Sequence, residues 1–148
     1  MSKITDFCIA ECERQNDLTT ESVAGMVEAH CFFACTPFDY NTEEAIQIIK
    51  ETAEIIKPQN KIGFRQTPVT FANGKRGLDH SLIERAMTNL FDAKDELSAE
   101  EFYIEFEEIH PFEDGNGRLG AILYNLFNET IDEPVIPPFS FTSNDLSE

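Results

Sequence analysis

The chain has 148 residues, a length that predicts one domain able to bury a sizeable hydrophobic core. Its 28 acidic and 11 basic residues give a formal net charge of −17. This charge argues against binding nucleic acid or an anionic membrane through a general positive field. Thirteen phenylalanines and no tryptophan predict a phenylalanine-rich interior.

The N-terminal segment predicts a cytoplasmic protein. Residues 1–20 are polar and interrupted by charges, so they lack the apolar stretch of a secretory signal. No apolar run approaches the about 20 residues that span a bilayer. The four cysteines form two pairs, each spaced four residues apart: Cys8, Cys12, Cys31 and Cys35. A four-thiolate zinc site across two helices is conceivable, but reduced cytoplasmic thiols are the favoured interpretation.

Helical periodicity dominates the first part of the chain. Ile4, Phe7 and Cys8 predict a short first helix, and a second is expected over about 22–35, ended by Thr36-Pro37. A third is predicted from a capping box, Asn41 with Glu44. Its apolar stripe continues to Pro58 through Ala45, Ile46, Ile49, Ala53 and Ile56.

One segment has an extended pattern. Between Phe64 and Leu78, Val69 and Phe71 alternate with polar residues before Asn73-Gly74. An Asn-Gly pair is the usual two-residue hairpin turn, because both positions tolerate positive φ. The sequence therefore predicts one β-hairpin among helices, placed at the surface because a lone hairpin is a weak core element.

Three further helical patterns follow. One carries Leu82, Ile83, Ala86, Met87 and Leu90. The next begins at a second capping box, Ser98 with Glu101, and continues through Phe102, Phe106 and Ile109. The last carries Ile122, Leu123, Leu126 and Phe127. The tail is expected to be irregular because of Pro134, Pro137 and Pro138, and residues 140–148 are expected to fray.

The loop between the last two helices reads HPFEDGNGR from His110 to Arg118. A glycine-bearing loop that opens a helix presents free backbone N–H groups and the positive end of a dipole, which favours an anion such as phosphate. His110 can accept a proton near neutral pH. Asp114 is either an N-cap of the next helix or a ligand for a divalent cation, and the second role is favoured.

This loop resembles the Fic family signature HPFx(D/E)GNGRxxR, with Ala121 in place of the second arginine. The resemblance, which covers roughly residues 20–139, implies an all-α Fic fold: a compact helical bundle with one β-hairpin flap upstream of the loop. It implies a single domain over 1–148, divided into N-terminal helices (1–36), a Fic core (37–139) and the tail.

The resemblance also implies a reaction, the transfer of AMP from ATP to a Ser, Thr or Tyr hydroxyl of a target protein. His110 would be the general base and Asp114 the Mg²⁺ ligand. Phosphate binding is assigned to Gly115, Asn116, Gly117 and Arg118, and target docking by strand addition to Thr67, Val69, Thr70 and Phe71. Phe112 is expected to anchor the loop and Glu113 to face solvent.

Two departures from the family pattern leave alternatives open. The second arginine grips the γ-phosphate in typical members, so Ala121 puts ATP placement in doubt. Doc-type kinases also lack it, but their loop has alanine and lysine where this chain keeps Gly115 and Gly117. Thr20–Gly25 fits the frame of an inhibitory helix, (S/T)xxxE(G/N), with Ala24 where the glutamate would be. Alternatively, this segment is only a helix start.

Three functions therefore compete. The first is a protein adenylyltransferase without the usual inhibitory contact. The second is a Doc-like kinase or another nucleotide-dependent transferase on the same fold. The third is an inactive Fic-fold interaction protein, which Ala121 favours and the intact His110 and Asp114 oppose. The expected partners are ATP and a target protein, with a separate inhibitor or homo-oligomer left open.

Overall fold

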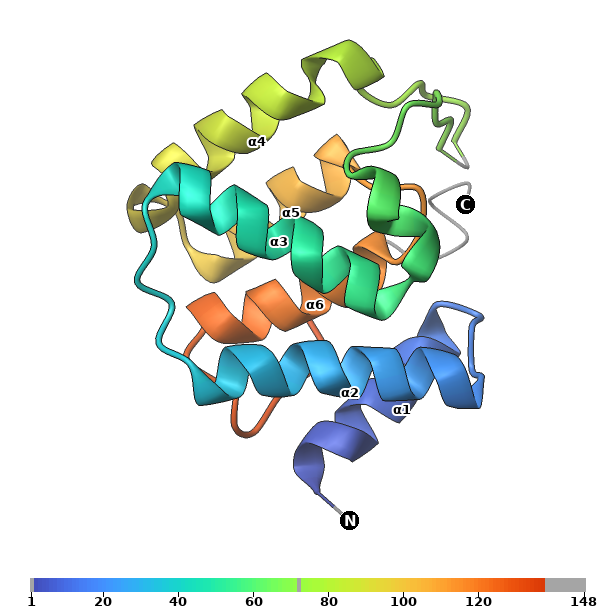
Figure 1. Cartoon of the computed structure of the whole chain (residues 1–148), viewed down its shortest axis with the longest axis vertical. Coiled ribbons are helices and arrows are strands. Elements are labelled where there is room, and N and C mark those ends of the chain that lie inside the picture. Colours follow the sequence, from blue (N-terminus) through green and yellow to red (C-terminus); the bar gives the residue numbers. More distant parts are fainter. Residues whose placement is uncertain (1, 72, 138–148) are drawn as a thin grey trace.

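The computed structural model describes residues 2–71 and 73–137, and these form an all-helical molecule (Figure 1). Its α-helices are α1 (Lys3–Arg14), α2 (Thr20–Cys35), α3 (Thr42–Ile56), α4 (Ile83–Asp92), α5 (Ala99–Ile109) and α6 (Asn116–Phe127). Short 3₁₀ turns cover Pro58–Ile62, His80–Leu82 and Lys94–Glu96. The tail beyond residue 137, including the expected fraying over 140–148, lies outside the described residues.

Local capping determines where the helices begin. The predicted capping boxes are confirmed, because Asn41 and Ser98 each exchange two hydrogen bonds with the glutamate three residues later. Helix α2 begins at Thr20, earlier than expected, because the Thr19 side chain accepts a hydrogen bond from the N–H of Ser22. Helix α1 is longer than its three apolar residues suggested and continues to Arg14.

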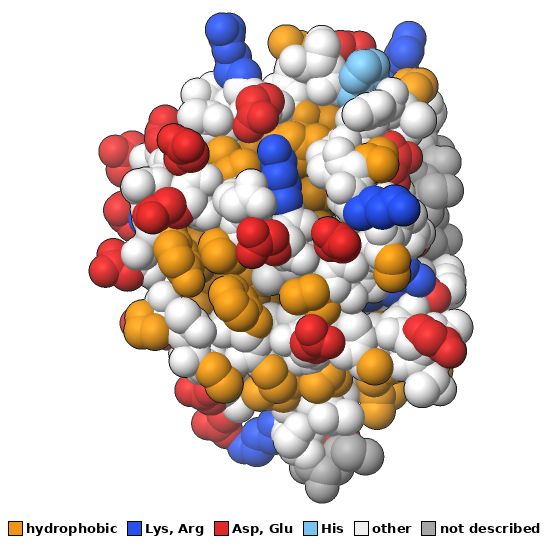
Figure 2. All heavy atoms as spheres, in the orientation of Figure 1, with side chains coloured by type: hydrophobic (Ala, Val, Ile, Leu, Met, Phe, Trp, Pro, Cys, Tyr) orange, Lys and Arg blue, Asp and Glu red, His pale blue; other side chains and the backbone are white. Residues whose placement is uncertain are grey.

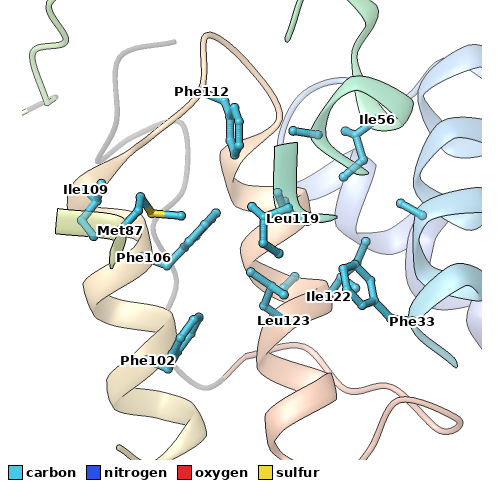
Figure 3. Packing of buried hydrophobic residues seen from close by; sticks show 14 of the residues in the cluster. Phe33, Ile56, Met87, Phe102, Phe106, Ile109, Phe112, Leu119, Ile122 and Leu123 are labelled. Carbon is cyan, nitrogen blue, oxygen red and sulfur yellow. The ribbon is translucent and has the colours of Figure 1, made fainter. Parts of the chain in front are cut away.

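Helix α6 is the central element of the fold. It lies between α2 on one side and α3 and α5 on the other (Figure 1), and its residues 116–125 are all buried. Figure 3 shows Leu119, Ile122 and Leu123 of α6 among side chains from the surrounding helices. The buried cluster includes phenylalanines from several elements: Phe7, Phe33, Phe91, Phe102, Phe106 and Phe112. The phenylalanine-rich interior is therefore confirmed, and it holds the start of α6 in a fixed position.

The expected β-hairpin is wrong. Among the described residues of 64–78 there is no strand, and the segment forms a loop with one isolated antiparallel bridge between Thr70 and Arg76. The bridge is closed by hydrogen bonds from the N–H of Phe71 to Lys75 O and from Gly77 N–H to Val69 O. Pairing cannot extend further because Pro68 has no N–H, and Arg65 N–H is bonded to Pro111 O, outside the segment.

The surface matches the acidic composition. Figure 2 shows Asp and Glu side chains spread over the face that it draws, with few basic groups between them. Hydrophobic side chains gather in part of the same face. Among the partly buried hydrophobic residues packed against the core are Val23, Val27 and Phe32 of α2. Within the part of the chain that the structure describes, no helix combines the length and apolarity needed to cross a membrane.

Candidate active site

His110 ends α5 in a left-handed conformation, with φ 49° and ψ 64°. Its N–H donates to Phe106 O at 3.0 Å, which closes the last turn of the helix. A non-glycine residue with positive φ is uncommon and needs support from its surroundings. The next residue, Pro111, cannot continue the helix, so the chain turns sharply into the loop that leads to α6.

Arg65 supports this turn from the opposite side. Its guanidinium donates to four carbonyls around the loop: His110 O at 2.6 Å, Thr67 O at 2.8 Å, Leu78 O at 2.7 Å and Ile109 O at 3.3 Å. The backbone N–H of Arg65 donates to Pro111 O at 2.8 Å. Arg65 is only 3% exposed, so one buried side chain fixes both the end of α5 and the 64–78 segment.

The His110 imidazole is buried, with 2% of its surface exposed, and lies 6.3 Å from the Phe71 ring in an edge-to-face arrangement. Burial lowers the pKa of His110 to about 4, with help from the Arg65 charge, although Asp114 and Glu113 act in the opposite direction. The ring is therefore neutral at pH 7, with a lone pair available to accept a proton. It lines a cavity of about 300 Å³ together with Thr67, Val69 and Thr70.

The loop that follows is closed by Phe112 and Asn116. The Phe112 side chain points from the loop into the core (Figure 3), as expected of an anchor. The Asn116 amide accepts from Phe112 N–H at 2.8 Å and donates to Phe112 O at 2.9 Å. Asn116 is fully buried, so its side chain shapes the loop, and a direct contact to phosphate stays a prediction.

Gly115 and Gly117 stand at the start of α6. Gly115 has φ +79°, and a Cβ there would also approach the Ile56 side chain to 2.9 Å, so glycine is required. Gly115 is the N-cap and supplies no side-chain cap, so no side chain of the N-cap occupies the first-turn N–H groups of α6, which belong to buried residues. At Gly117 a Cβ would come within 2.5 Å of the Gln15 side chain. The turn after α1 therefore lies directly against this helix start.

Asp114 lies half-buried beside this helix start. Its Oδ1 accepts from Gly115 N–H at 2.7 Å and from Arg118 at 3.4 Å, and its Oδ2 accepts from the Gln59 amide at 3.3 Å. Asp114 lines a cavity of about 870 Å³. One accessible carboxylate with space for water suits Mg²⁺, which is usually held by one or two carboxylates together with substrate phosphates. No cluster of three potential metal ligands occurs within 2–71 and 73–137.

Arg118 is buried, with its side chain 2% exposed, and points toward the turn between α1 and α2. One guanidinium nitrogen donates to Asp17 Oδ2 at 2.5 Å. Lys57 reaches the same oxygen at 2.6 Å, and Ser22 Oγ donates to it at 2.9 Å. Burial would raise the pKa of Asp17, but these hydrogen bonds from Lys57, Ser22 and Arg118 outweigh it and lower the pKa to about 2.

Glu113 does not simply face solvent, which corrects that expectation. Its carboxylate accepts from the N–H of Gln66 at 3.0 Å and from the Thr67 hydroxyl at 3.0 Å. Glu113 and Thr67 line both cavities. The Asp114 cavity and the His110 cavity are therefore neighbours that share one wall. Of the predicted docking residues, Thr67, Val69 and Thr70 line the His110 cavity, and Phe71 contacts the His110 ring.

Ala24 and Ala121, which stand where the family pattern has a glutamate and an arginine, lie in different environments. Ala121 is fully buried in the core cluster, whereas Ala24 is exposed on α2. An arginine at 121 would have to enter the hydrophobic core.

All four cysteines are free thiols that differ in burial. Cys8 and Cys12 are buried, Cys31 is half-buried and Cys35 is exposed.

Sequence reasoning missed three residues of this site: Arg65, Lys57 and Asp17. Each lies far along the chain from the His110–Arg118 loop, and no local pattern marks it. Lys57 directly follows α3, and Asp17 lies two residues before Thr19, the N-cap of α2. The sequence offered only a weak signal for Lys57 and Asp17: each is a charged residue beside the end of a predicted helix. Such residues can meet when folding brings several helix ends together.

The chain was compared with known proteins. The model of the Fic/DOC family matches residues 39–128, more than half of the chain, and the match includes the whole His110–Arg118 loop. No curated protein matches the chain. Members of the matched family are typically transferases. Because the match covers α3 to α6 and the loop that joins the two cavities, this chain belongs to the Fic/DOC family.

Proposed function

We propose that this protein transfers AMP from ATP to a hydroxyl group of a target protein. The observation that carries the proposal is the pairing of the two cavities. One is lined by Asp114 and Lys57, close to the start of α6, which suits a polyphosphate. The other is lined by His110 and residues of the 64–78 segment, which suits a peptide hydroxyl. Glu113 and Thr67 form their common wall, so the two reactants would meet there.

The chemistry assigned to the residues is a balanced displacement. The oxygen of a target Ser, Thr or Tyr attacks the α-phosphorus of ATP, and the bond from that phosphorus to the bridging oxygen breaks, so that pyrophosphate leaves. His110 takes the hydroxyl proton, since its imidazole is neutral at pH 7. The approach of the phosphate charges raises the pKa of His110 and makes the ring a better base when the nucleotide is bound.

The phosphates would be held by the first-turn N–H groups of α6, which begins at Asn116, and by the Arg118 fork. Asp114 would hold Mg²⁺, whose charge would offset that of the phosphates. The net charge of −17 repels a nucleotide at long range, so binding depends on these local groups. Positioning and charge stabilisation would then supply most of the rate.

The target would dock at the 64–78 segment. The Thr70–Arg76 bridge is too short to form a sheet by itself. Nevertheless, Val69 and Thr70 line the His110 cavity, and an extended target peptide would pair with the backbone of this segment. This arrangement would place a side-chain hydroxyl near the imidazole.

The test uses ATP labelled at the α- or the γ-phosphate, incubated with the protein in a cell lysate. Label transferred to protein from the α position, and not from γ, is the expected result. Transfer from γ alone would show a kinase, which is the alternative that Ala121 suggests. No transfer from either position would favour an interaction protein and would refute the proposal.

A further inference from the structure

Lys57 lies outside the His110–Arg118 loop but reaches the same place. It directly follows α3, and its Nζ is 2.6 Å from Asp17 Oδ2 and 3.0 Å from Ser22 Oγ. Its side chain is 20% exposed and lines the 870 Å³ cavity together with Asp114. Lys57 is therefore positioned to contact whatever enters that cavity beside Asp114.

Asp17 Oδ2 has the surroundings of a bound phosphoryl oxygen. A single oxygen accepts hydrogen bonds from Arg118, Lys57 and Ser22, at 2.5, 2.6 and 2.9 Å. Two of these donors are cations, and charge-assisted bonds of this kind are the ones that bind phosphate. The donors come from three different elements, α6, the end of α3 and the first turn of α2.

The cations and the anion are held differently. Arg118 belongs to the buried central helix and Lys57 to the end of α3, whereas Asp17 lies in the turn between α1 and α2. That turn contains Asn16 with a positive φ of 57°. Its backbone hydrogen bonds run from Asn16 N–H to Glu13 O at 3.0 Å, from Asp17 N–H to Cys12 O at 2.9 Å and from Thr19 N–H to Asp17 O at 3.2 Å, all within the turn and the end of α1. A turn can move with fewer broken contacts than a packed helix. The carboxylate is therefore the exchangeable partner of the three.

Comparison with the family signature suggests why a lysine would lie beside Arg118. Position 121, where the signature has a second arginine, holds Ala121 inside the hydrophobic core. Ala121 carries no charge, so under the proposed function a second cation for the phosphates would be another residue. Lys57 is the cation that meets Arg118 at a shared oxygen.

We propose that Lys57 and Arg118 together bind one phosphoryl group of the nucleotide, and that the Asp17 carboxylate occupies the place of that group until the nucleotide binds. This proposal rests on the nucleotide site of the proposed function. Binding exchanges one anion for another: the Asp17 carboxylate leaves the two cations, and a phosphoryl oxygen takes its hydrogen bonds. The turn between α1 and α2 then has to shift.

The test is calorimetric titration of the protein with inorganic pyrophosphate in the presence of Mg²⁺. Lys57→Gln should weaken pyrophosphate binding about tenfold, the effect of one charged hydrogen bond. Lys57→Arg should retain most of the affinity. Lys61→Gln is the matched control, since Lys61 is exposed on the adjoining 3₁₀ turn and does not line the cavity. Unchanged binding by Lys57→Gln would overturn the proposal.

Asp17→Asn separates displacement from a purely structural role. We expect it to lower the melting temperature, because Lys57 and Arg118 lose their shared partner, and yet to bind pyrophosphate about tenfold more tightly. The double variant with Lys57→Gln should lose most of that gain. Weaker binding that parallels the lower melting temperature would overturn the displacement.

A measurement on the unaltered protein covers the case in which Asp17→Asn does not fold. Pyrophosphate should speed amide hydrogen exchange at Asp17 N–H, because the turn is released; slower exchange there would contradict the proposal. None of these readouts requires transfer. Pyrophosphate binding through Lys57 without AMP transfer would refute the proposed function alone, and normal transfer by Lys57→Gln would refute this proposal alone.

Discussion

Arg65 Nε donates a 2.6 Å hydrogen bond to the carbonyl oxygen of His110, and this contact joins the candidate base to the segment expected to dock the target. The same guanidinium binds the carbonyls of Thr67 and Leu78. One side chain therefore supports both the left-handed His110 backbone and the neighbouring loop. Burial is the main cause of the lowered pKa of His110, and the Arg65 charge adds to it.

The first prediction concerns the titration of His110. Followed by NMR, its imidazole should titrate with a pKa of about 4, and Arg65→Met should raise that pKa because a nearby positive charge is removed. A His110 that titrates near 6.5 in both proteins would contradict the buried, neutral ring.

The lowered pKa of His110 also makes the free energy of unfolding depend on pH. The unfolded chain takes up the His110 proton near the ordinary value of 6.5, before the folded protein does, so unfolding is favoured as the pH falls from about 6.5 to about 4. Urea unfolding of His110→Asn should show a weaker loss of stability over this window than the unaltered protein. An identical loss in both would show that other groups are responsible.

The second prediction concerns the Glu113 contact. Glu113→Gln should speed amide exchange at Gln66, whose N–H donates to the carboxylate, and destabilise the protein by about 1 kcal/mol at most. Transfer to protein should fall while nucleotide affinity is kept, because the wall between the cavities loosens. Glu108→Gln, at an exposed position of α5, is the control. Unchanged exchange at Gln66 would show that the contact does not hold the segment.

The sequence predicted the helices because their signals are local. The capping pairs at Asn41 and Ser98 and the apolar stripes act within a few residues, and the structure has each of them. The hairpin failed for a non-local reason: Asn73-Gly74 does form a turn, but Arg65 ties the preceding arm to Pro111 and His110. No sequence pattern around Arg65 shows which carbonyls its guanidinium and backbone N–H groups will bind.

The residues of the candidate site likewise fall into two groups, those that local sequence identifies and those that only the fold brings together. The His110–Arg118 loop could be identified from its letters, because its residue types act together over a short stretch. Lys57 and Asp17 could not, since their role depends on how the ends of α1, α2 and α3 meet at the start of α6. Local spacing also could not show that Ala121 lies in the core.

The third prediction uses Asp17. Its pKa is about 2 in the folded protein and lies near 3.8 for an unperturbed carboxyl, so its contribution to stability is present above about 3.8 and is lost as the pH falls toward 2. Asp17→Asn should therefore be less stable than the unaltered protein at pH 6, with the difference shrinking toward pH 2. The exposed Asp39→Asn serves as control. A difference that does not change with pH would refute the ionic contribution.

The fourth prediction concerns the metal. Asp114→Asn should weaken ATP binding in the presence of Mg²⁺ and have little effect without it, because an amide is a poorer ligand for a hard cation. Calorimetry with and without Mg²⁺ separates the two cases. Equal losses in both conditions would assign Asp114 to the helix start, where it accepts from Gly115 N–H, and not to the metal.

The most direct test of the central claim is mass spectrometry of a modified target, with the unaltered protein and His110→Ala compared at equal ATP occupancy. The unaltered protein should attach AMP to a Ser, Thr or Tyr side chain, and the variant should bind ATP normally but attach none. Attachment of a phosphoryl group, or of AMP at an undiminished rate by His110→Ala, would contradict the account.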